Sequence, residues 1–513
     1  MPNYLAPGVY VEEVTGSRPI EGVGTAVAAF VGFAAQGPFN TPTLVTNWSQ
    51  YSQTFGEFAP DCYLGHAVYG YFMQGGGAAY IVRVGGDRAG ASGEAVPAGA
   101  EPAAILGTYR VVARALPEGV PDDLSVEVAD PPEGAAEDRF TLIVKRGGQV
   151  AETFEAVTTK RGKDNVVTVV RERSKLITIE EAAPTGQLAR PQGGEVALTG
   201  IGPGPGSAPE TVSADEYVGD AAERTGFGGL EAVDEVTMVA VPDLMGAYQR
   251  GAIDLESVKA VQSAMIAHCE LMGDRMAILD PPPGLSPQQV KEWRTDQAGH
   301  DSKYATLYYP WIKVFDPLSG TNRFMPPSGH IAGVWARNDA TRGVHKAPAN
   351  ESIRGAVALE TQLTRAEQEL LNPIGVNCIR AFPGRGILVW GARTLSSDPA
   401  WRYLNVRRLF NYLEESILNG TQWVVFEPND DALWARIRRT ISAFLVNEWR
   451  RGALFGLTPD EAFFVRCDRE TNPAESIDAG QVVCQIGVAP VKPAEFVIFQ
   501  LAQLSGGTSL VNE

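Results

Sequence analysis

The strongest constraint on the fold of this chain is a regular alternation of strand-like and helix-like segments in its second half. Val236–Val241 is an almost continuous apolar run, as is typical of a parallel strand covered on both faces. Leu255–Met272 follows with helical spacing of its apolar residues. The alternation continues through Arg275–Leu279, Pro287–Gln297, Tyr304–Tyr309 and Trp311–Phe315. This β-α-β-α-β order predicts an α/β fold built on a doubly wound sheet.

The segments before this alternation divide into a core part and an insertion. Thr25–Ala35 and Tyr80–Val84 are predicted core strands, so residues 25–86 are assigned to the first part of the α/β core and residues 226–384 to the rest. Residues 87–225 are rich in Gly, Pro, Ala and Glu, with hairpin-like turns between β-like pieces. The clearest of these pieces are Leu124–Ala129 and Phe140–Val144. We therefore expect one or two inserted β-rich domains on the surface.

A second unit, of the α+β class, is predicted over residues 385–479. Its elements in chain order are strand Gly386–Trp390, helix Trp401–Leu418, strand Trp423–Phe426 and helix Asp431–Arg451. The last helix has an apolar stripe, and Arg436, Arg438 and Arg439 lie on the rest of its surface. These arginines are either a solvated helix face or a basic patch that meets an acidic partner surface.

Both ends of the chain are predicted to be extended arms, over residues 1–24 and 480–513. The N-terminal strand consists of Val9, Tyr10, Val11, Glu12, Glu13 and Val14. The C-terminal strands consist of Val482, Val483, Cys484, Gln485 and Ile486, and of Phe496, Val497, Ile498, Phe499 and Leu501. A strand without a nearby partner exposes an open edge, which pairing with a neighbouring chain would complete. Because donor and acceptor strands differ, such contacts are heterologous and build rings or helices. Residues 15–24 and 490–493 are expected to be flexible linkers.

Composition limits the class of protein. The chain has 513 residues, enough for two to four domains, and its 43 Lys and Arg against 61 Asp and Glu give a net charge of −18. That balance disfavours nucleic acid or an anionic membrane as the main partner. The five cysteines are scattered, with no CxxC pair, which predicts neither a disulfide framework nor a zinc site. We expect no signal peptide and no membrane insertion, because there is no basic n-region and no long apolar span, and hence a cytoplasmic protein.

Catalytic chemistry has little support in the sequence. A serine hydrolase hypothesis would take Asp243 or Asp280 at a strand end, His330 or His345 as the base and Ser352 as the nucleophile. There is no GxSxG nucleophile elbow, and Ser328 beside His330 fixes no triad geometry. Glycine-rich stretches lack the context of a phosphate-binding loop, and no metal-ligand spacing occurs. We therefore expect no catalytic residues, no cofactor and no metal.

Several segments together resemble the sheath proteins of contractile phage tails and of phage-tail-like injection systems. The resemblance rests on PGVYVEEV, TAVAAFVGFAAQGP, GGGAAYIVRV, DEVTMVAVPD, RMAILDPP, PPSGHIAGVWARND, RGVHKAPAN, NPIGVNCIRAFPGRGILVWGARTLS and WRYLNVRRLFNYLEESI. It covers roughly residues 1–86 and 230–503, and leaves out the insertion.

The resemblance implies a non-enzymatic machine part assembled in the cytoplasm as a phage tail or tail-like particle. It implies a subtilisin-like domain without protease chemistry, a C-terminal α+β domain, and terminal arms that join neighbouring subunits by strand exchange. Stacked six-fold rings would surround an inner tube protein, with baseplate and terminator or cap proteins at the ends, and contraction would drive the tube through a target envelope. Arg436, Arg438 and Arg439 are candidate tube-facing residues. The alternatives are a subtilisin-like serine hydrolase and a passive cell-surface layer protein, the latter disfavoured by the lack of an export signal.

Overall fold

The computed structural model describes residues 19–85 and 212–500, with parts of the segment between them. Those parts are residues 102–106, 109–113, 124–131, 139–146, 149–160, 162–181, 191, 194–197 and 199–200. The predicted N-terminal strand Val9–Val14 and the residue Leu501 lie outside the described residues.

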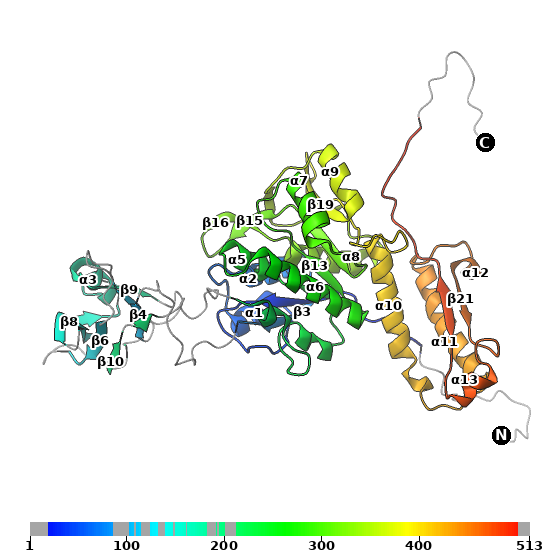
Figure 1. Ribbon diagram of the computed structural model, residues 1–513, viewed down its shortest axis with the longest axis horizontal. Helices are drawn as coiled ribbons and strands as arrows, with labels where there is room; N and C mark the ends of the chain where they lie inside the picture. Colours follow the sequence, from blue (N-terminus) through cyan, green and yellow to red (C-terminus); the bar gives the residue numbers. More distant parts are fainter. Residues whose placement is uncertain are drawn as a thin grey trace, which may run out of the picture.

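The largest element is a nine-stranded mixed sheet, drawn at the centre of Figure 1. Its order is β17 (Glu351–Ser352), β20 (Gly386–Val389), β19 (Val376–Phe382), β14 (Ala305–Tyr309), β13 (Met276–Leu279), β12 (Met238–Ala240), β1 (Val27–Gly32), β3 (Ala78–Arg83) and β2 (Thr43–Val45). The six strands from β19 to β3 run parallel, and β2, β20 and β17 pair antiparallel at the two sides. The α/β core predicted from the alternating pattern is therefore present.

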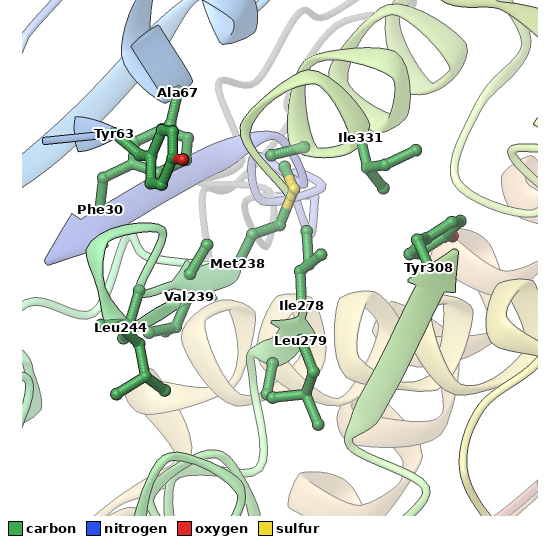
Figure 2. Packing of buried hydrophobic residues seen from close by; sticks show 14 of the residues in the cluster. Phe30, Tyr63, Ala67, Met238, Val239, Leu244, Ile278, Leu279, Tyr308 and Ile331 are labelled. Carbon is green, nitrogen blue, oxygen red and sulfur yellow. The ribbon is translucent and has the colours of Figure 1, made fainter. Parts of the chain in front are cut away.

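Helices cover both faces of this sheet, and every residue of β12, β13 and β14 is therefore buried. In Figure 2, Met238 and Ile278 lie on the side of α8 (Ser328–Arg342), which carries Ile331, whereas Val239 and Leu279 lie on the opposite side. The other helices of this part are α1 (Trp48–Phe55), α2 (Leu64–Gln74), α4 (Ala214–Val218), α5 (Asp243–Gln249), α6 (Leu255–Met272), α7 (Pro287–Glu292), α9 (Arg365–Leu371), the 3-10 helices η2 (Gly228–Ala232) and η4 (Asn372–Ile374), and the π-helix η3 (Trp293–Ala298). The predicted helix Leu255–Met272 is confirmed at both ends: the Asp254 side chain accepts from the backbone N–H of Ser257, and Gly273 ends the helix in the left-handed conformation.

Two predicted strands pair in a different sheet from the one expected. Trp311–Phe315 does not join the parallel sheet, because β15 (Ile312–Asp316) pairs antiparallel with β16 (Thr321–Met325) and β18 (Ala356–Leu359) in a separate sheet. Gly386–Trp390 was assigned to the C-terminal unit, but β20 pairs with β19 and β17 in the large sheet. Both strands were recognised correctly as strands, and only their partners were not, since pairing depends on residues far along the chain.

The described part of the insertion consists of two four-stranded antiparallel sheets. One contains β11 (Thr199–Gly200), β4 (Pro102–Leu106), β5 (Tyr109–Ala113) and β9 (Ile177–Glu181), and the other β10 (Gly194–Ala197), β6 (Leu124–Ala129), β7 (Arg139–Arg146) and β8 (Gln149–Thr158), with helix α3 (Val166–Arg173). β7 and β8 form a hairpin with Arg146 opposite Gln149, one of the hairpin-like turns expected in this region. Tyr109 of one sheet and Val126 of the other belong to a single hydrophobic cluster, separate from that of the large sheet.

The C-terminal part is a pair of long helices with a small hairpin. Its elements are α10 (Leu404–Gly420), η5 (Gln422–Val424), α11 (Asp431–Arg450), α12 (Pro459–Ala462), β21 (Phe463–Arg466), α13 (Ala474–Asp478) and β22 (Gln485–Val488). Figure 1 shows α10 and α11 side by side, and Tyr412 of α10 packs against Phe444 of α11 with ring centroids 6.2 Å apart. None of the described helices is long and apolar enough to cross a lipid bilayer.

The predicted strand Trp423–Phe426 is wrong. This segment forms the short turn η5 and a loop between α10 and α11, and Phe426 has a φ of 65° and a fully exposed side chain. Aromatic and β-branched residues favour strands only where a partner strand is present, and the described chain places none beside this segment.

Candidate functional site

The structure does not bring the residues of the hydrolase hypothesis together in a catalytic triad. Asp243 begins α5 at the point where the strand order reverses between β12 and β1, which is where α/β sheets commonly bind ligands. Its carboxylate is fully buried and accepts hydrogen bonds from the backbone N–H groups of Phe33 at 2.7 Å, Leu64 at 3.3 Å and Tyr63. Burial raises the pKa of Asp243 to about 6, although these N–H groups oppose the shift. The carboxylate thus occupies this position and links the end of β1, the start of α2 and α5 by hydrogen bonds.

The other candidate catalytic residues have separate structural partners. Asp280 accepts from the Ser328 hydroxyl at 2.6 Å and from the Ser328 backbone N–H at 3.0 Å, and all of these groups are buried. His330 is buried against Gly70 of α2, where an added Cβ would lie 2.4 Å from the imidazole ring. Ser352 lies exposed in β17, and His345 lies in the loop after α8. Among the described residues, no histidine is hydrogen-bonded to Ser328 or Ser352.

The N-terminal arm has a fixed root on α10. Ile20 is buried in the cluster of α10 and α11, and the backbone N–H of Val23 donates to the Ser416 hydroxyl at 3.1 Å. Gly22 lies so close to Tyr412 that an added Cβ would be 2.0 Å from the phenol oxygen. Part of the linker predicted to be flexible is therefore packed: Ile20 and Val23 lie against the helix, where a small residue at Gly22 allows the close contact, whereas Pro19, Glu21 and Gly24 are exposed.

A buried ion pair joins this root to both main parts of the molecule. Arg408 of α10 donates to the two carboxylate oxygens of Asp339 in α8, at 2.9 and 2.6 Å, and both side chains are almost fully buried. The Arg408 guanidinium also donates to the Thr25 carbonyl at 3.0 Å, and the Thr25 hydroxyl donates to Asp339 at 2.7 Å. The sequence shows an Arg407-Arg408 pair but not which carboxylate neutralises it, because Asp339 is far away in the chain.

The β21–β22 hairpin is the strand edge nearest to the C-terminal arm. The two strands pair antiparallel from Phe463 opposite Val488 to Arg466 opposite Gln485. They form a sheet by themselves, so within the described chain each strand has one edge without a partner. A two-stranded sheet is marginally stable alone, and this one packs its inner face into the cluster of α10 and α11.

The first predicted C-terminal strand, Val482–Ile486, is displaced towards the C-terminus. The strand begins at Gln485, because Val483 is held outside the ladder by Asn472. The Val483 N–H donates to the Asn472 side chain at 2.6 Å, and the Asn472 amide donates to the Val483 carbonyl at 3.0 Å. A single asparagine thus satisfies backbone groups that a strand would pair with another strand.

The second predicted C-terminal strand is extended but unpaired in the described chain. Residues 491–500 form no ladder, and Phe496, Val497, Ile498 and Phe499 are 72%, 67%, 82% and 84% exposed. Four consecutive exposed apolar side chains are unusual on a soluble surface and mark a contact site. Figure 1 shows this segment leaving the folded body before the chain ends.

The three candidate tube-facing arginines differ in their surroundings. Arg436 is paired with Glu427 at 3.1 Å and lies over the Trp423 ring. Arg438 is partly buried and donates to the Cys467 carbonyl, which fixes it to the hairpin. Arg439 is exposed. Arg436 and Arg439 are therefore the two whose charges remain accessible on α11.

Comparison with known families is informative for most of the chain. A family model described as the phage tail sheath protein central domain matches residues 222–395, and one described as the phage tail sheath C-terminal domain matches residues 396–503. The boundary between the two lies after β20, in agreement with the membership of that strand in the large sheet.

Individual tail sheath proteins are also similar to this chain. The tail sheath protein of Vibrio phage KVP40 is 28% identical over 294 residues, which is 54% of this chain and 41% of that protein. The tail sheath protein of Burkholderia phage BcepMu is 25% identical over 527 residues, which is 97% of this chain and 96% of that protein. This chain thus spans less than half of the first relative and nearly all of the second. Among solved structures, a chain of the anti-feeding prophage baseplate, 6-fold symmetrised, is 25% identical with a TM-score of 0.58, covering 98% of this chain and 99% of that one.

Proposed function

The chain belongs to the phage tail sheath family, and on that premise we propose that it is the structural subunit of a contractile sheath. Subunits polymerise as stacked six-fold rings around an inner tube, and contraction of the sheath drives the tube through a target envelope. We further propose that the α/β core is subtilisin-like without protease chemistry, with the β-rich insertion as a surface domain.

The observation that carries the proposal is that one subunit has both an unpaired apolar segment, Phe496–Phe499, and a hairpin with two open edges. An open edge and an exposed apolar strand on one soluble molecule are an aggregation hazard unless a specific partner covers them. A second copy of this chain can supply a partner for the open edge and for the apolar strand, since its C-terminal strand fits the open edge of β21 or β22 by main-chain pairing. The N-terminal strand Val9–Val14 of another copy would cover the remaining edge.

This exchange leads to an open or ring-shaped assembly rather than a two-fold dimer. The donated strands and the accepting hairpin are different surfaces, so each subunit gives to one neighbour and receives from another. Ile20 and Val23, which pack on α10, and Glu495, which is held by Arg393, would fix the points from which the two arms leave the body of each subunit. Repetition of one heterologous contact then builds rings and stacks.

Further partners follow from membership in the family. We propose that the sheath surrounds an inner tube protein, with Arg436 and Arg439 on the tube-facing surface, and that baseplate and terminator or cap proteins bind its ends. Assembly takes place in the cytoplasm, as part of a tail or tail-like particle.

The test is assembly of the full-length chain and of a variant that lacks residues 1–18. We expect the full-length chain to form rings or tubes in electron micrographs. The variant should keep the circular dichroism spectrum and melting temperature of the folded subunit but remain monomeric, because it retains Ile20 and Val23, which pack on α10, and lacks the strand Val9–Val14. Tubes of normal appearance from the truncated chain would contradict strand exchange through the N-terminal arm.

A further inference from the structure

The C-terminal arm crosses from the hairpin to the central α/β part before it leaves the body. The Ala489 N–H donates to the Ala462 carbonyl at 2.8 Å, and the Val491 N–H donates to the Ala453 carbonyl at 3.2 Å, so the arm starts on the C-terminal part. The Asn405 side chain at the start of α10 then donates to the Val491 carbonyl at 3.1 Å. Four residues later, Glu495 lies against residues of the central part.

Glu495 fits a socket of three polar side chains. Arg393 donates through Nε to Oε1 at 2.8 Å and through Nη2 to Oε2 at 2.6 Å. Asn372 donates to Oε1 at 2.8 Å, and the Tyr403 hydroxyl donates to Oε2 at 3.3 Å. Two parallel bonds between a guanidinium and a carboxylate fix orientation as well as distance. These donors, led by Arg393, outweigh the effect of burial and lower the pKa of Glu495.

The socket is formed by residues that hold each other independently of the arm. The Arg393 backbone N–H donates to the Asn377 side chain at 2.7 Å, and Arg393 Nη1 donates to the Asn372 carbonyl at 3.2 Å. The Arg393 side chain is 9% exposed and that of Glu495 19%. The guanidinium is therefore presented in a fixed position for the carboxylate.

This part of the arm is only partly covered by the body. Val491 to Val497 line a groove of about 970 Å³, and Lys492 and Ala494 are exposed. Directly after Glu495 the side chains become exposed, beginning with Phe496 at 72%. Glu495 is thus the last fixed point of the chain before the apolar segment.

We propose that Glu495 is a positioning residue for strand donation: its insertion into the socket of Arg393, Asn372 and Tyr403 fixes the place and direction in which the C-terminal strand leaves the subunit. This inference rests on the proposed function, in which Phe496–Leu501 is donated to a neighbour. A strand that leaves from a fixed point loses less conformational freedom on pairing than one on a loose tether, so it assembles at lower subunit concentration.

The test uses the full-length chain with Glu495→Ala and Glu495→Gln, and with Glu256→Gln as a matched control. Glu256 is an exposed carboxylate in the first turn of α6 without a socket. We expect the melting temperature to stay close to that of the control, while the lowest concentration that gives tubes rises at least about tenfold for Glu495→Ala, which removes the bonds from Arg393, Asn372 and Tyr403 together. For Glu495→Gln, which keeps the shape of the side chain but not its charge, this concentration should lie between that of the control and that of Glu495→Ala.

Two further measurements separate this role from a general loss of stability. Combination of Glu495→Ala with Arg393→Ala should change the assembly concentration by less than the product of the single effects, because both remove the same contact. In hydrogen exchange on dilute, unassembled chain, the Val491 amide should exchange about tenfold faster in Glu495→Ala, whereas amides of β21 should not change.

The outcomes are distinguishable from failure of the proposed function. Equal assembly concentrations for wild type and Glu495→Ala would overturn the positioning role while leaving the sheath proposal intact. If the wild-type chain forms no tubes, the sheath proposal fails, and unchanged exchange at Val491 in Glu495→Ala would then overturn the socket as well.

Discussion

At the scale of single residues, the buried pair Arg408–Asp339 is the contact with the largest expected effect on stability. Replacement of Arg408 by Ala leaves the Asp339 carboxylate buried with only the Thr25 hydroxyl as a donor. Loss of one partner of a buried pair costs about 3–5 kcal/mol, because the remaining charge stays desolvated. We expect this decrease in the free energy of unfolding by urea. Arg365→Ala, which removes an exposed pair with Glu369, should cost about 0.5 kcal/mol or less.

Asp280 gives a prediction about pH. Burial raises its pKa to about 7, above the value of about 3.9 in an unfolded chain, although the Ser328 donors oppose the shift. Between these values the folded protein binds more protons than the unfolded one, so its stability falls as the pH rises, by at most about 1.4 kcal/mol per pH unit. Asp280→Asn should remove this dependence.

The measurement compares wild type with Asp280→Asn between pH 5 and 8. Burial lowers the pKa of His268, His300 and His330 to about 4, so these residues add an opposite slope where the unfolded imidazoles titrate, but they do so equally in both chains. The free energy of unfolding of wild type relative to Asp280→Asn should therefore fall as the pH rises to about 7 and level off above it. Parallel curves of unfolding free energy against pH for wild type and Asp280→Asn would contradict the assignment.

At the scale of elements, α10 determines where the N-terminal arm begins. Gly22→Ala places a Cβ 2.0 Å from the Tyr412 phenol oxygen and 2.8 Å from Tyr412 Cζ, so root and helix must separate. We expect a loss of about 1–3 kcal/mol in the free energy of unfolding, as for other overpacked contacts. Gly24→Ala is the matched control, because no atom lies within 4 Å of a Cβ there. Equal stability of the two variants would show that the root is not packed in solution.

At the scale of the whole molecule, the accessible arginines of α11 predict the contact with the tube. Arg436→Glu combined with Arg439→Glu reverses two accessible charges without touching the hairpin or the arms. We expect the sheath to polymerise normally but to bring down less tube protein when it is purified, with a stronger effect at low salt. Arg365→Glu is the control, since it reverses an exposed charge of α9 on the central part. Unchanged recovery of the tube would place its contact elsewhere.

Elements whose signals are local could be predicted from the amino-acid sequence. Leu255–Met272 is a helix because its cap, its apolar spacing and Gly273 lie within the segment, and Val236–Val241 contains a strand because its apolar run needs cover on two faces. The exposed C-terminal segment was also recognisable, since Phe496–Phe499 is apolar with no nearby partner, whereas the N-terminal strand Val9–Val14 stays a prediction.

Contacts between distant segments could not be predicted in this way. β20 pairs with β19 and β17, Trp423–Phe426 is a loop, and Glu495 reaches Arg393 across 102 residues of chain. The propensity of a segment describes its own backbone preference, and its periodicity describes which of its faces can be buried in a protein interior. The choice of a strand partner, or of the carboxylate that neutralises a buried arginine, depends on which surfaces come together when the whole chain packs, and no local pattern carries that information.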